Sequence, residues 1–539
     1  MPWHVLLKHR GFQAIKWVNE MIKAIQITLV SMGMAMLLAA CAVGPDFKAP
    51  ASPTVERYSK ELNQPASALE LTLNYDIATA VPQLLDSDTI PAQWWQLFES
   101  NQLEQLIQRS LKASPTLQVA ETRLQASRET FAANTGSILY PSIDGSFSAT
   151  RQKISGASFG GDSLMFSLQN ASLDMSYSLD PAGGNRRFLE FSKAQVEYEV
   201  IQLHAARITL VSNIVTSVIS EASLRDQISA LIEMIDAQKQ QLELSEKKFE
   251  IGVISKTEVL SQRASLAQTR MQLPTLQQLL SQTRHQLATL SGELPSQAVL
   301  PEFHLDDLTL PHQIPVTLPS QLTRQRPDIR ASEALLHQAS AQVGVATANL
   351  YPSLTLTGSY GSETSSVSNL FSAGTAAWGL GAGLLQPVFH GGELQAKKRA
   401  AVASYQQAAA QYRGDVLKAF QDVADALLAL EMDGKKLTLQ QQAETFSSQT
   451  HDLVNAQYQQ GAASYLDLLN AKSQYQQSRI ALLQARAALY TDTAALMFAL
   501  GGGWWNDEST SLQKSDPIKK IQIKSVTLPT SALLEAEKS

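Results

Sequence analysis

The sequence predicts an α+β fold made of one unit repeated twice, in which long coiled-coil-like helices alternate with β-hairpin strands. Three observations support this class. Landmarks recur in the same order at a spacing of about 210 residues, helical segments reach unusual lengths, and the hydrophobic period changes from 3.6 to 2 once in each half. Two copies are fewer than a solenoid requires, so a duplicated unit is the better interpretation.

The repeat is visible in three matched segments, followed from the N-terminus. Leu139-Tyr140-Pro141-Ser142 returns as Leu350-Tyr351-Pro352-Ser353, Pro181-Ala182-Gly183-Gly184 as Pro387-Val388-Phe389-His390-Gly391-Gly392, and Phe249-Glu250-Ile251-Gly252 as Tyr458-Gln459-Gln460-Gly461. Upstream of each first landmark a proline, Pro115 or Pro327, opens a helical segment, because proline is tolerated in a first helical turn. The first repeat is therefore placed at 101–300 and the second at 327–500.

Each half is expected to contain the same three helical segments: 101–138, 184–249 and 256–292 in the first, and 327–350, 392–458 and 464–499 in the second. At 1.5 Å per residue, the longest helix of each half would reach roughly 100 Å. A helix this long without a globular domain around it must pack laterally against other helices, in coiled-coil fashion.

Between these helices, four segments alternate apolar residues with Ser, Gly, Thr or Asp, at about 141–152, 164–180, 352–363 and 376–388. Strands of about ten residues with one apolar face match transmembrane β-barrels. An antiparallel sheet of a soluble protein, with one face on the core and one in solvent, gives the same pattern. A membrane barrel must close, and the smallest have about eight strands. If these strands span a membrane, several copies of the chain must share one barrel.

The N-terminal segment predicts export and lipid attachment at Cys41, the only cysteine. An apolar run shorter than a membrane span follows several basic residues, so residues 1–40 are expected to be a signal peptide, with Met1 or Met21 as the true start. Leu38-Ala39-Ala40-Cys41 resembles a bacterial lipobox. In bacterial lipoproteins an Asp after the cysteine favours retention in the inner membrane, and here that position is Ala42. A buried apolar cysteine or a catalytic thiol are the alternatives.

Composition and motifs argue against several classes of function. The chain has a net charge of −6, and residues after 40 have 39 basic against 48 acidic side chains, which disfavours a nucleic-acid partner. The nine histidines form no His-x-x-x-His pair and no P-loop is present, so no metal and no cofactor is expected apart from the lipid on Cys41. Gly156-Ala157-Ser158-Phe159-Gly160 fits a nucleophile elbow, yet it lies between two expected strands and suits a hairpin loop better.

Further motifs give a family resemblance: Cys41-Ala42-Val43-Gly44-Pro45-Asp46-Phe47, Trp94-Trp95-Gln96-Leu97-Phe98, Arg326-Pro327-Asp328-Ile329-Arg330 and the two strand-to-helix junctions near Gly184 and Gly392. Together they resemble the outer-membrane efflux factors of the TolC superfamily, in the lipoprotein branch of NodT and OprM. This resemblance implies a homotrimer with a shared twelve-stranded transmembrane β-barrel, continued by a periplasmic α-barrel. Residues 41–100, 301–326 and 501–539 would then belong to the lipidated N-terminus and an equatorial region.

The resemblance also implies a function and partners. The chain would be the outer-membrane exit duct of a tripartite efflux system, passively conducting drugs, toxic compounds or metal ions received from an inner-membrane RND pump through a periplasmic adaptor. The duct would not be an enzyme, and outer-membrane lipid would surround its barrel. Three alternatives remain: an outlet duct for a protein-secretion exporter, a non-conducting lipoprotein that braces the envelope, and a surface hydrolase using Ser158.

The resemblance finally places a periplasmic gate at the two turns that follow Gly252 and Gly461. Glu258 and Asp467 would be constricting carboxylates, Tyr458 a latch between helices, and Asn470 would replace a second acid found in some members. Three copies would form a ring of acids that concentrates cations. The residues alone leave another interpretation open, because acidic side chains also stabilise the N-terminal turns of helices.

Overall fold

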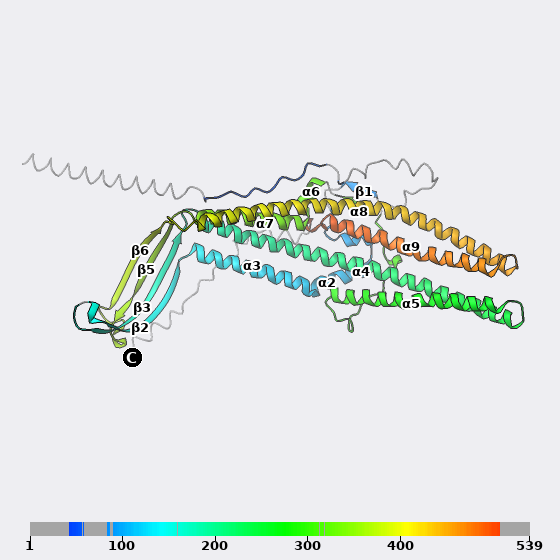
Figure 1. Ribbon diagram of the computed structural model, residues 1–539, viewed down its shortest axis with the longest axis horizontal. Helices are drawn as coiled ribbons and strands as arrows, with labels where there is room; N and C mark the ends of the chain where they lie inside the picture. Colours follow the sequence, from blue (N-terminus) through cyan, green and yellow to red (C-terminus); the bar gives the residue numbers. More distant parts are fainter. Residues whose placement is uncertain are drawn as a thin grey trace, which may run out of the picture. The chain divides into compact units, whose positions relative to one another are not determined.

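The computed structural model describes residues 42–55, 58, 83–86, 90–158, 160–311, 313–316 and 319–506. The predicted signal peptide, Cys41 and the tail after residue 506 lie outside these residues. The described chain confirms the α+β class, with long helices and one antiparallel sheet (Figure 1).

Two compact units divide the chain, and each contains segments from both repeats. The sheet unit comprises Met1–Pro50, Thr122–Val200 and Ala331–Gly414, and the helical unit comprises Ala51–Glu121, Ile201–Arg330 and Asp415–Ser539. The expected segments 101–300 and 327–500 therefore describe the repeat in the sequence, whereas the compact units combine corresponding parts of the two copies.

The two longest helices of each half match in length. The first half contains α2 (Asn101–Ala113), α3 (Pro115–Leu139), α4 (Gly184–Glu250) and α5 (Lys256–Leu290), and the second contains α6 (Pro319–Gln325), α7 (Pro327–Ala348), α8 (Glu393–Gln459) and α9 (Tyr465–Ala499). Helices α4 and α8 each have 67 residues, and α5 and α9 each have 35. The segment expected at 101–138 divides at Ser114, because Pro115 has no N–H to continue the hydrogen-bond ladder.

The sheet has four antiparallel strands in the order β2 (Ser142–Ile154), β3 (Leu164–Leu179), β5 (Ser353–Thr364) and β6 (Ala376–Leu385). These strands lie within three residues of the expected segments at every end. Paired residues share a face, and one row across the sheet joins Gly145, Leu173, Tyr360 and Trp378. The outer strands, β2 and β6, each leave one edge without a partner among the described residues.

The two faces of this sheet differ sharply in polarity. The face that contains Tyr360 and Trp378 exposes its large apolar side chains: Ile143 67%, Phe147 60%, Leu173 57%, Tyr360 64%, Trp378 73%, Leu380 80% and Leu384 70%. Away from the loop between β2 and β3, the opposite face contains mainly serine, threonine, glycine and acidic residues, such as Asp144 paired with Asp174. An exposed apolar patch of this kind marks a surface that contacts lipid or protein.

Residues directly after Cys41 are fastened to the sheet unit near the end of β3. The Val43 N–H donates to the Ala182 carbonyl at 3.0 Å, and the Arg187 guanidinium donates to the Val43 and Gly44 carbonyls and to Asp46, at 2.6 Å for the carboxylate. Gly44 has φ of +100°, and a Cβ there would lie 2.6 Å from the Gly344 Cα. Only glycine fits this close approach.

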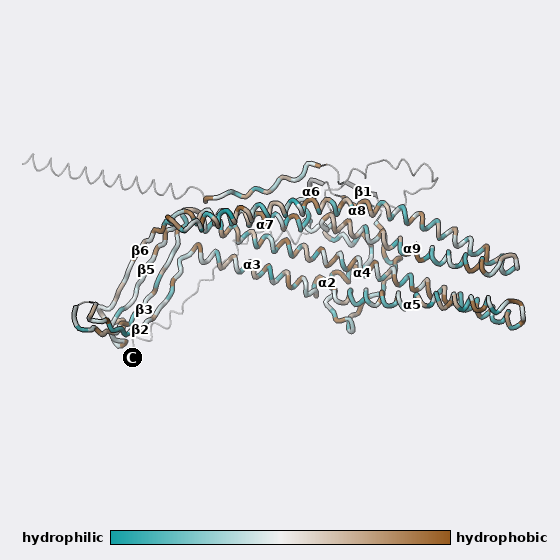
Figure 2. The backbone as a smooth tube through the Cα atoms, in the orientation of Figure 1, coloured by the Kyte–Doolittle hydropathy of each residue, from teal (hydrophilic) through white to brown (hydrophobic). Residues whose placement is uncertain are grey.

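The core of the helical unit contains the aromatic motif seen in the sequence. Trp94 and Phe98 are each 1% exposed, and their rings contact each other edge to face. Other fully buried side chains of this unit are Leu103, Leu106, Ile107, Leu287, Phe303 and Leu305. A short parallel pair formed by β1 (Gln83–Asp86) and β4 (Gln313–Val316) joins the two segments expected at 41–100 and 301–326, where no strand was predicted. Along α4 and α8, apolar and polar residues alternate throughout (Figure 2), as expected for helices packed laterally.

Among the described residues, α4 alone is long and apolar enough to cross a membrane by length and composition. Its most apolar window has a mean hydropathy of 1.2, and half of that window is buried within the protein. Helices that pack in a protein core meet the same criteria, so this property does not assign α4 to a membrane.

Candidate functional site

The two turns that the sequence singled out have the same backbone geometry. Gly252 and Gly461 adopt φ of +78° and +76°. In the first turn, the Val253 N–H donates to the Lys248 carbonyl at 2.8 Å; in the second, the Ala462 N–H donates to the Gln457 carbonyl at 2.8 Å. This left-handed glycine ending terminates both long helices, so the sequence repeat is also a structural repeat.

Each return helix then begins with a serine cap. Ser255 accepts a hydrogen bond from the Glu258 N–H, and Ser464 accepts one from the Asp467 N–H, both at 3.2 Å. The Asp467 carboxylate also accepts from the Ser464 N–H at 3.0 Å and from its hydroxyl at 2.6 Å, which completes a capping box. These hydrogen bonds lower the pKa of Asp467, so its side chain stays ionised while it stabilises the start of α9.

Glu258 has the same position on α5 but makes a different contact. Its carboxylate accepts a hydrogen bond at 2.6 Å from the hydroxyl of Tyr458, which lies 200 residues away on α8. The two acids that the sequence treats as equivalent therefore differ: Asp467 closes its own helix, and Glu258 joins the two helical hairpins. The structure brings Glu258 and Tyr458 together, as the latch hypothesis requires.

Tyr458 lies in a small cluster at the end of the hairpins. Its ring meets the Tyr465 ring edge to face, with centroids 6.0 Å apart, and the Lys248 ammonium lies 5.5 Å above it. Burial, and then the hydrogen bond to Glu258, raise the pKa of Tyr458. Burial and the Glu258 charge also raise the pKa of Tyr465 to about 12. Both phenols therefore remain protonated and can donate at physiological pH.

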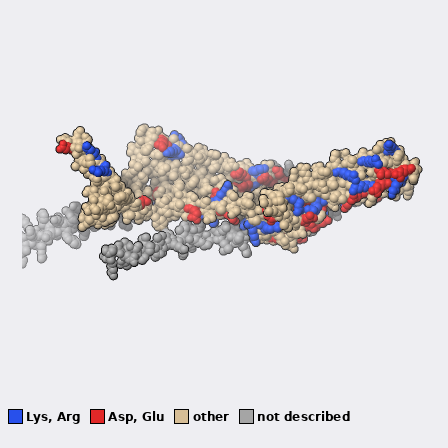
Figure 3. Space-filling view, turned by 90° about the horizontal axis from the view of Figure 1, so that it is seen from below, with Lys and Arg blue, Asp and Glu red and all other residues tan. Residues whose placement is uncertain are grey.

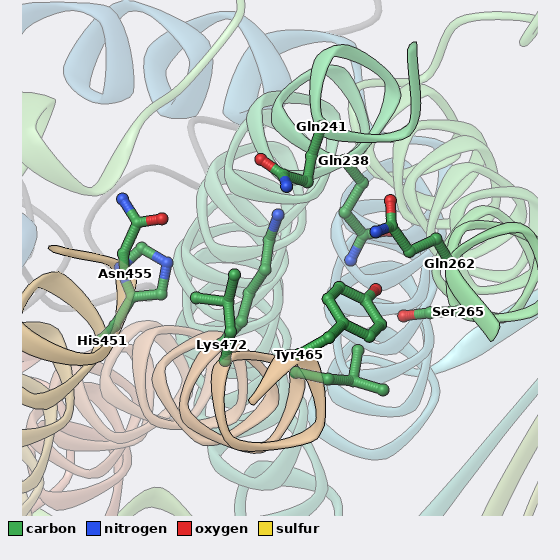
Figure 4. A pocket seen from close by; sticks show the side chains of 10 residues that line it. Gln238, Gln241, Gln262, Ser265, His451, Asn455, Tyr465 and Lys472 are labelled. Atoms are coloured by element: carbon green, nitrogen blue, oxygen red, sulfur yellow. The ribbon is translucent and has the colours of Figure 1, made fainter. Parts of the chain in front are cut away.

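A polar cavity of about 50 Å³ lies next to this cluster, between the hairpins (Figure 4). Lys472 extends from α9 toward Gln241 of α4, and Tyr465 points toward Gln262 of α5. No acidic residue lines the cavity, and burial lowers the pKa of the Lys472 ammonium. Within the described chain, the buried carbonyl oxygens of Gln238 and Gln262 accept no hydrogen bond. A polar cavity of this size has room for water.

Further along the helices, the contact between the hairpins becomes apolar. Leu231, Met234, Ile235 and Leu266 are buried together, and Ile480 of α9 packs against them. Arg479 also reaches Glu233 at 2.7 Å. The hairpins are therefore anchored by hydrophobic contact in this region, whereas their ends are held by the Tyr458–Glu258 hydrogen bond beside a polar cavity.

The remaining predicted site residues are less connected. Asn470 is exposed on α9, and no hydrogen bond joins it to the described residues. Cys41 lies outside those residues, so the predicted lipid site stays a prediction. Sequence reasoning missed Lys472, although a signal existed: Leu468, Lys472 and Tyr475 follow helical spacing on the inward face of α9, where an apolar residue is expected.

The backbone around Ser158 does not form the nucleophile elbow that the sequence pattern suggested. Gly156–Ser158 forms a single 3-10 turn between β2 and β3, and a nucleophile elbow requires a turn from a strand into a helix. Among the described residues, no group of three His, Cys, Asp or Glu side chains is placed to hold a metal ion.

Three features together are typical of outer-membrane channel proteins. They are the exposed apolar face of the sheet, the two matched pairs of long helices, and the two helix ends with the same glycine turn. The family profile described as "Outer membrane efflux protein" matches residues 106–293 and 318–502, once in each half. The chain therefore belongs to the outer membrane efflux protein family and is a TolC-like transport protein of the outer membrane.

Curated relatives agree with this assignment. The chain is 31% identical over 429 residues to the pyoverdine export outer membrane protein OpmQ of Pseudomonas aeruginosa, covering 78% of this chain and 90% of that protein. It is 28% identical over 479 residues to the cation efflux system protein CusC of Escherichia coli, covering 88% and 98% of the two chains.

Solved structures share the fold over nearly their whole length. The outer-membrane channel OprN superposes with a TM-score of 0.78 at 28% identity, over 86% of this chain and all of that chain. VceC of Vibrio cholerae gives a TM-score of 0.71 at 27% identity, over 77% and 99%. The relatives are channel proteins, and none of these names indicates an enzyme.

Proposed function

We propose that three copies of this chain form one exit duct across the outer membrane, through which small molecules leave the periplasm passively. The observation that supports this best is the open four-stranded sheet. Its strands run up, down, up and down, so the β6 edge of one copy can pair with the β2 edge of the next in antiparallel fashion. Repetition of this pairing closes a barrel, with no backbone group left unpaired in lipid.

Strand geometry alone permits more than one number of copies. Two copies would provide the minimum of about eight strands, and three would provide twelve. The family resemblance favours three. In either assembly, the apolar face with Trp378 and Leu380 would meet lipid, and the serine-rich face with Asp144 and Asp174 would line a wet pore.

The gate of this duct would be the Tyr458–Glu258 contact. The hydrogen bond holds the α8–α9 hairpin to the α4–α5 hairpin at their ends, next to a polar cavity and beyond the apolar contact around Ile480. Release of this bond would let the ends separate while the apolar region stays packed. Asp467 and Asn470 would face the same constriction, with Asp467 contributing charge from its capping position.

The substrate would be a small molecule or ion. The relatives are named for export of pyoverdine, toluene and cations, and the first two are named as outer membrane proteins. A periplasmic adaptor and an inner-membrane RND pump would deliver the cargo here.

Cys41 would receive the lipid. Residues 42–47 begin beside Ala182, which lies just after β3 and just before α4. Arg187 would thus hold Val43, Gly44 and Asp46 at the end of the helices that faces the membrane. An acyl group on Cys41 would then enter the periplasmic leaflet.

Planar-bilayer recording of the purified oligomer tests the duct. Discrete conductance steps are expected from the wild type, with larger or more frequent openings after Tyr458→Phe. A bilayer that stays silent with both proteins, although each inserts, would instead favour the envelope brace.

A further inference from the structure

The basic side chains of β2 lie in an unusual place on the sheet. Arg151 and Lys153 are both exposed, and they alternate in phase with Ile143 and Phe147, so they stand on the apolar face. Their partners on β3 are Ser167 and Met165, and Arg151 donates to the Met165 sulfur at 3.4 Å. No acidic residue occurs on this face of the β2–β3 hairpin, and Asp162 is the only acid of its loop.

The polarity of both faces reverses at this level of the hairpin. Below it, β3 has Leu173 and Met175 on the apolar face; above it, the apolar residues Leu164, Phe166 and Leu168 are on the opposite face. In Figure 3, charged side chains lie on the arm at the left, whereas the surface next to the arm has few charged side chains. The reversal marks the end of the segment that suits hydrocarbon.

The height of the two cations can be derived from strand geometry. Arg151 follows Phe147, the last large apolar residue on this face of β2, by four residues, or about 14 Å along a strand. A tilt of about 45° converts this to roughly 10 Å above the hydrocarbon edge. Lipid headgroups occupy the first several ångströms there, and long basic side chains bend toward them.

The second hairpin does not share the feature. In the repeat, Ser362 and Thr364 of β5 are the residues equivalent to Arg151 and Lys153. Ser362 is buried, and its hydroxyl donates to Thr375 at 2.8 Å. The basic pair is therefore specific to the first hairpin, whereas the alternation around it belongs to the duplicated unit.

We propose that Arg151 and Lys153 form a binding site for the phosphate groups of lipids in the outer leaflet of the outer membrane. The inference rests on the proposed duct, because it requires the sheet to span the membrane with its hairpin loops outside. The Arg151 guanidinium offers paired donors that match phosphate oxygens, and Lys153 adds a second positive charge two residues further. A barrel of three copies would have three such sites around its rim.

Native mass spectrometry of the full-length oligomer in detergent tests the site, with bis-phosphorylated lipid A as the probe. The wild type is expected to bind this lipid more tightly than the same lipid without phosphates. Arg151→Gln with Lys153→Gln should weaken binding of the phosphorylated lipid by roughly 30-fold, since each basic group near an anionic surface contributes about fivefold.

Two control variants define the origin of the effect. Lys239→Gln with Arg270→Gln removes the same charge from exposed positions on α4 and α5 and should leave binding unchanged. Arg151→Lys with Lys153→Arg keeps both charges and should retain affinity within a few fold. Inorganic phosphate at equal concentration should not compete, which would identify the lipid as the source of the phosphate.

The same spectra separate failure of this site from failure of the duct. A trimer that binds phosphorylated and phosphate-free lipid equally, or a double variant that binds like the wild type, overturns the lipid site and leaves the duct intact. A chain that is monomeric in every spectrum overturns the duct, and the lipid site with it.

Discussion

Replacing Tyr458 with phenylalanine tests the gate, because it removes only the hydroxyl that donates to Glu258 at 2.6 Å. The edge-to-face contact with Tyr465 and the position of the ring under Lys248 are retained. A hydrogen bond to an ionised partner contributes about 1.5–3 kcal/mol when buried, and this site is partly exposed, so about 1 kcal/mol per copy is reasonable.

Three copies that open together would multiply this effect. A loss of about 3 kcal/mol shifts the ratio of open to closed ducts by roughly 150-fold. Single-channel recording should show a much higher open probability, and cells should become sensitive to a large hydrophilic antibiotic that an intact outer membrane excludes. Tyr475→Phe is the matched control, since Tyr475 stacks on His451 and no hydrogen bond of its hydroxyl joins the described residues. Equal open probabilities for Tyr458→Phe and wild type would refute the latch.

Four further outcomes are expected. Replacing both Glu258 and Asp467 with alanine should raise conductance and reduce cation preference, measured as a shift in reversal potential under a salt gradient; an unchanged potential would contradict the acidic ring. Cys41→Ser should abolish incorporation of labelled palmitate but leave the oligomer assembled, and label on the variant would disprove the site. Arg326→Gln should lower stability by about 3 kcal/mol in thermal denaturation, because the buried guanidinium donates to the Ala419 and Ala499 carbonyls, to Asp328 and to Asp422; Arg324→Gln is its neighbouring control. Burial, and then the charge of Asp433, raise the pKa of Asp492 to about 6, against a weaker opposing effect of Lys436. The folded state therefore binds this proton more tightly than the unfolded state, and the stability of the wild type should fall as the pH rises from about 4 to 6. Relative to the wild type, the stability of Asp492→Asn should rise by about 1 kcal/mol across that interval. A difference in stability between the two proteins that stays constant with pH would contradict the assignment.

Much of the fold could be predicted because its signals are local. Alternation along a strand assigned the faces of β3 and β5, and the glycines at 252 and 461 set the ends of the longest helices, since only neighbouring residues decide those conformations. Proline at 115 and 327 likewise set the starts of α3 and α7.

The parts that could not be predicted depend on contacts between distant residues. Glu258 and Asp467 have the same local surroundings in the sequence, and only the position of Tyr458 separates a bond between hairpins from a helix cap. The clamp of Arg187 on Asp46 and the parallel pairing of β1 with β4 also join segments more than 100 residues apart. No periodicity reports such partners.

The mass of the purified protein in detergent, measured by light scattering with the detergent contribution subtracted, tests the assembly most directly. The proposed barrel of three copies predicts a protein mass three times that of a single processed chain. A single-chain mass, in a preparation that stays dispersed once detergent is withdrawn, would contradict it.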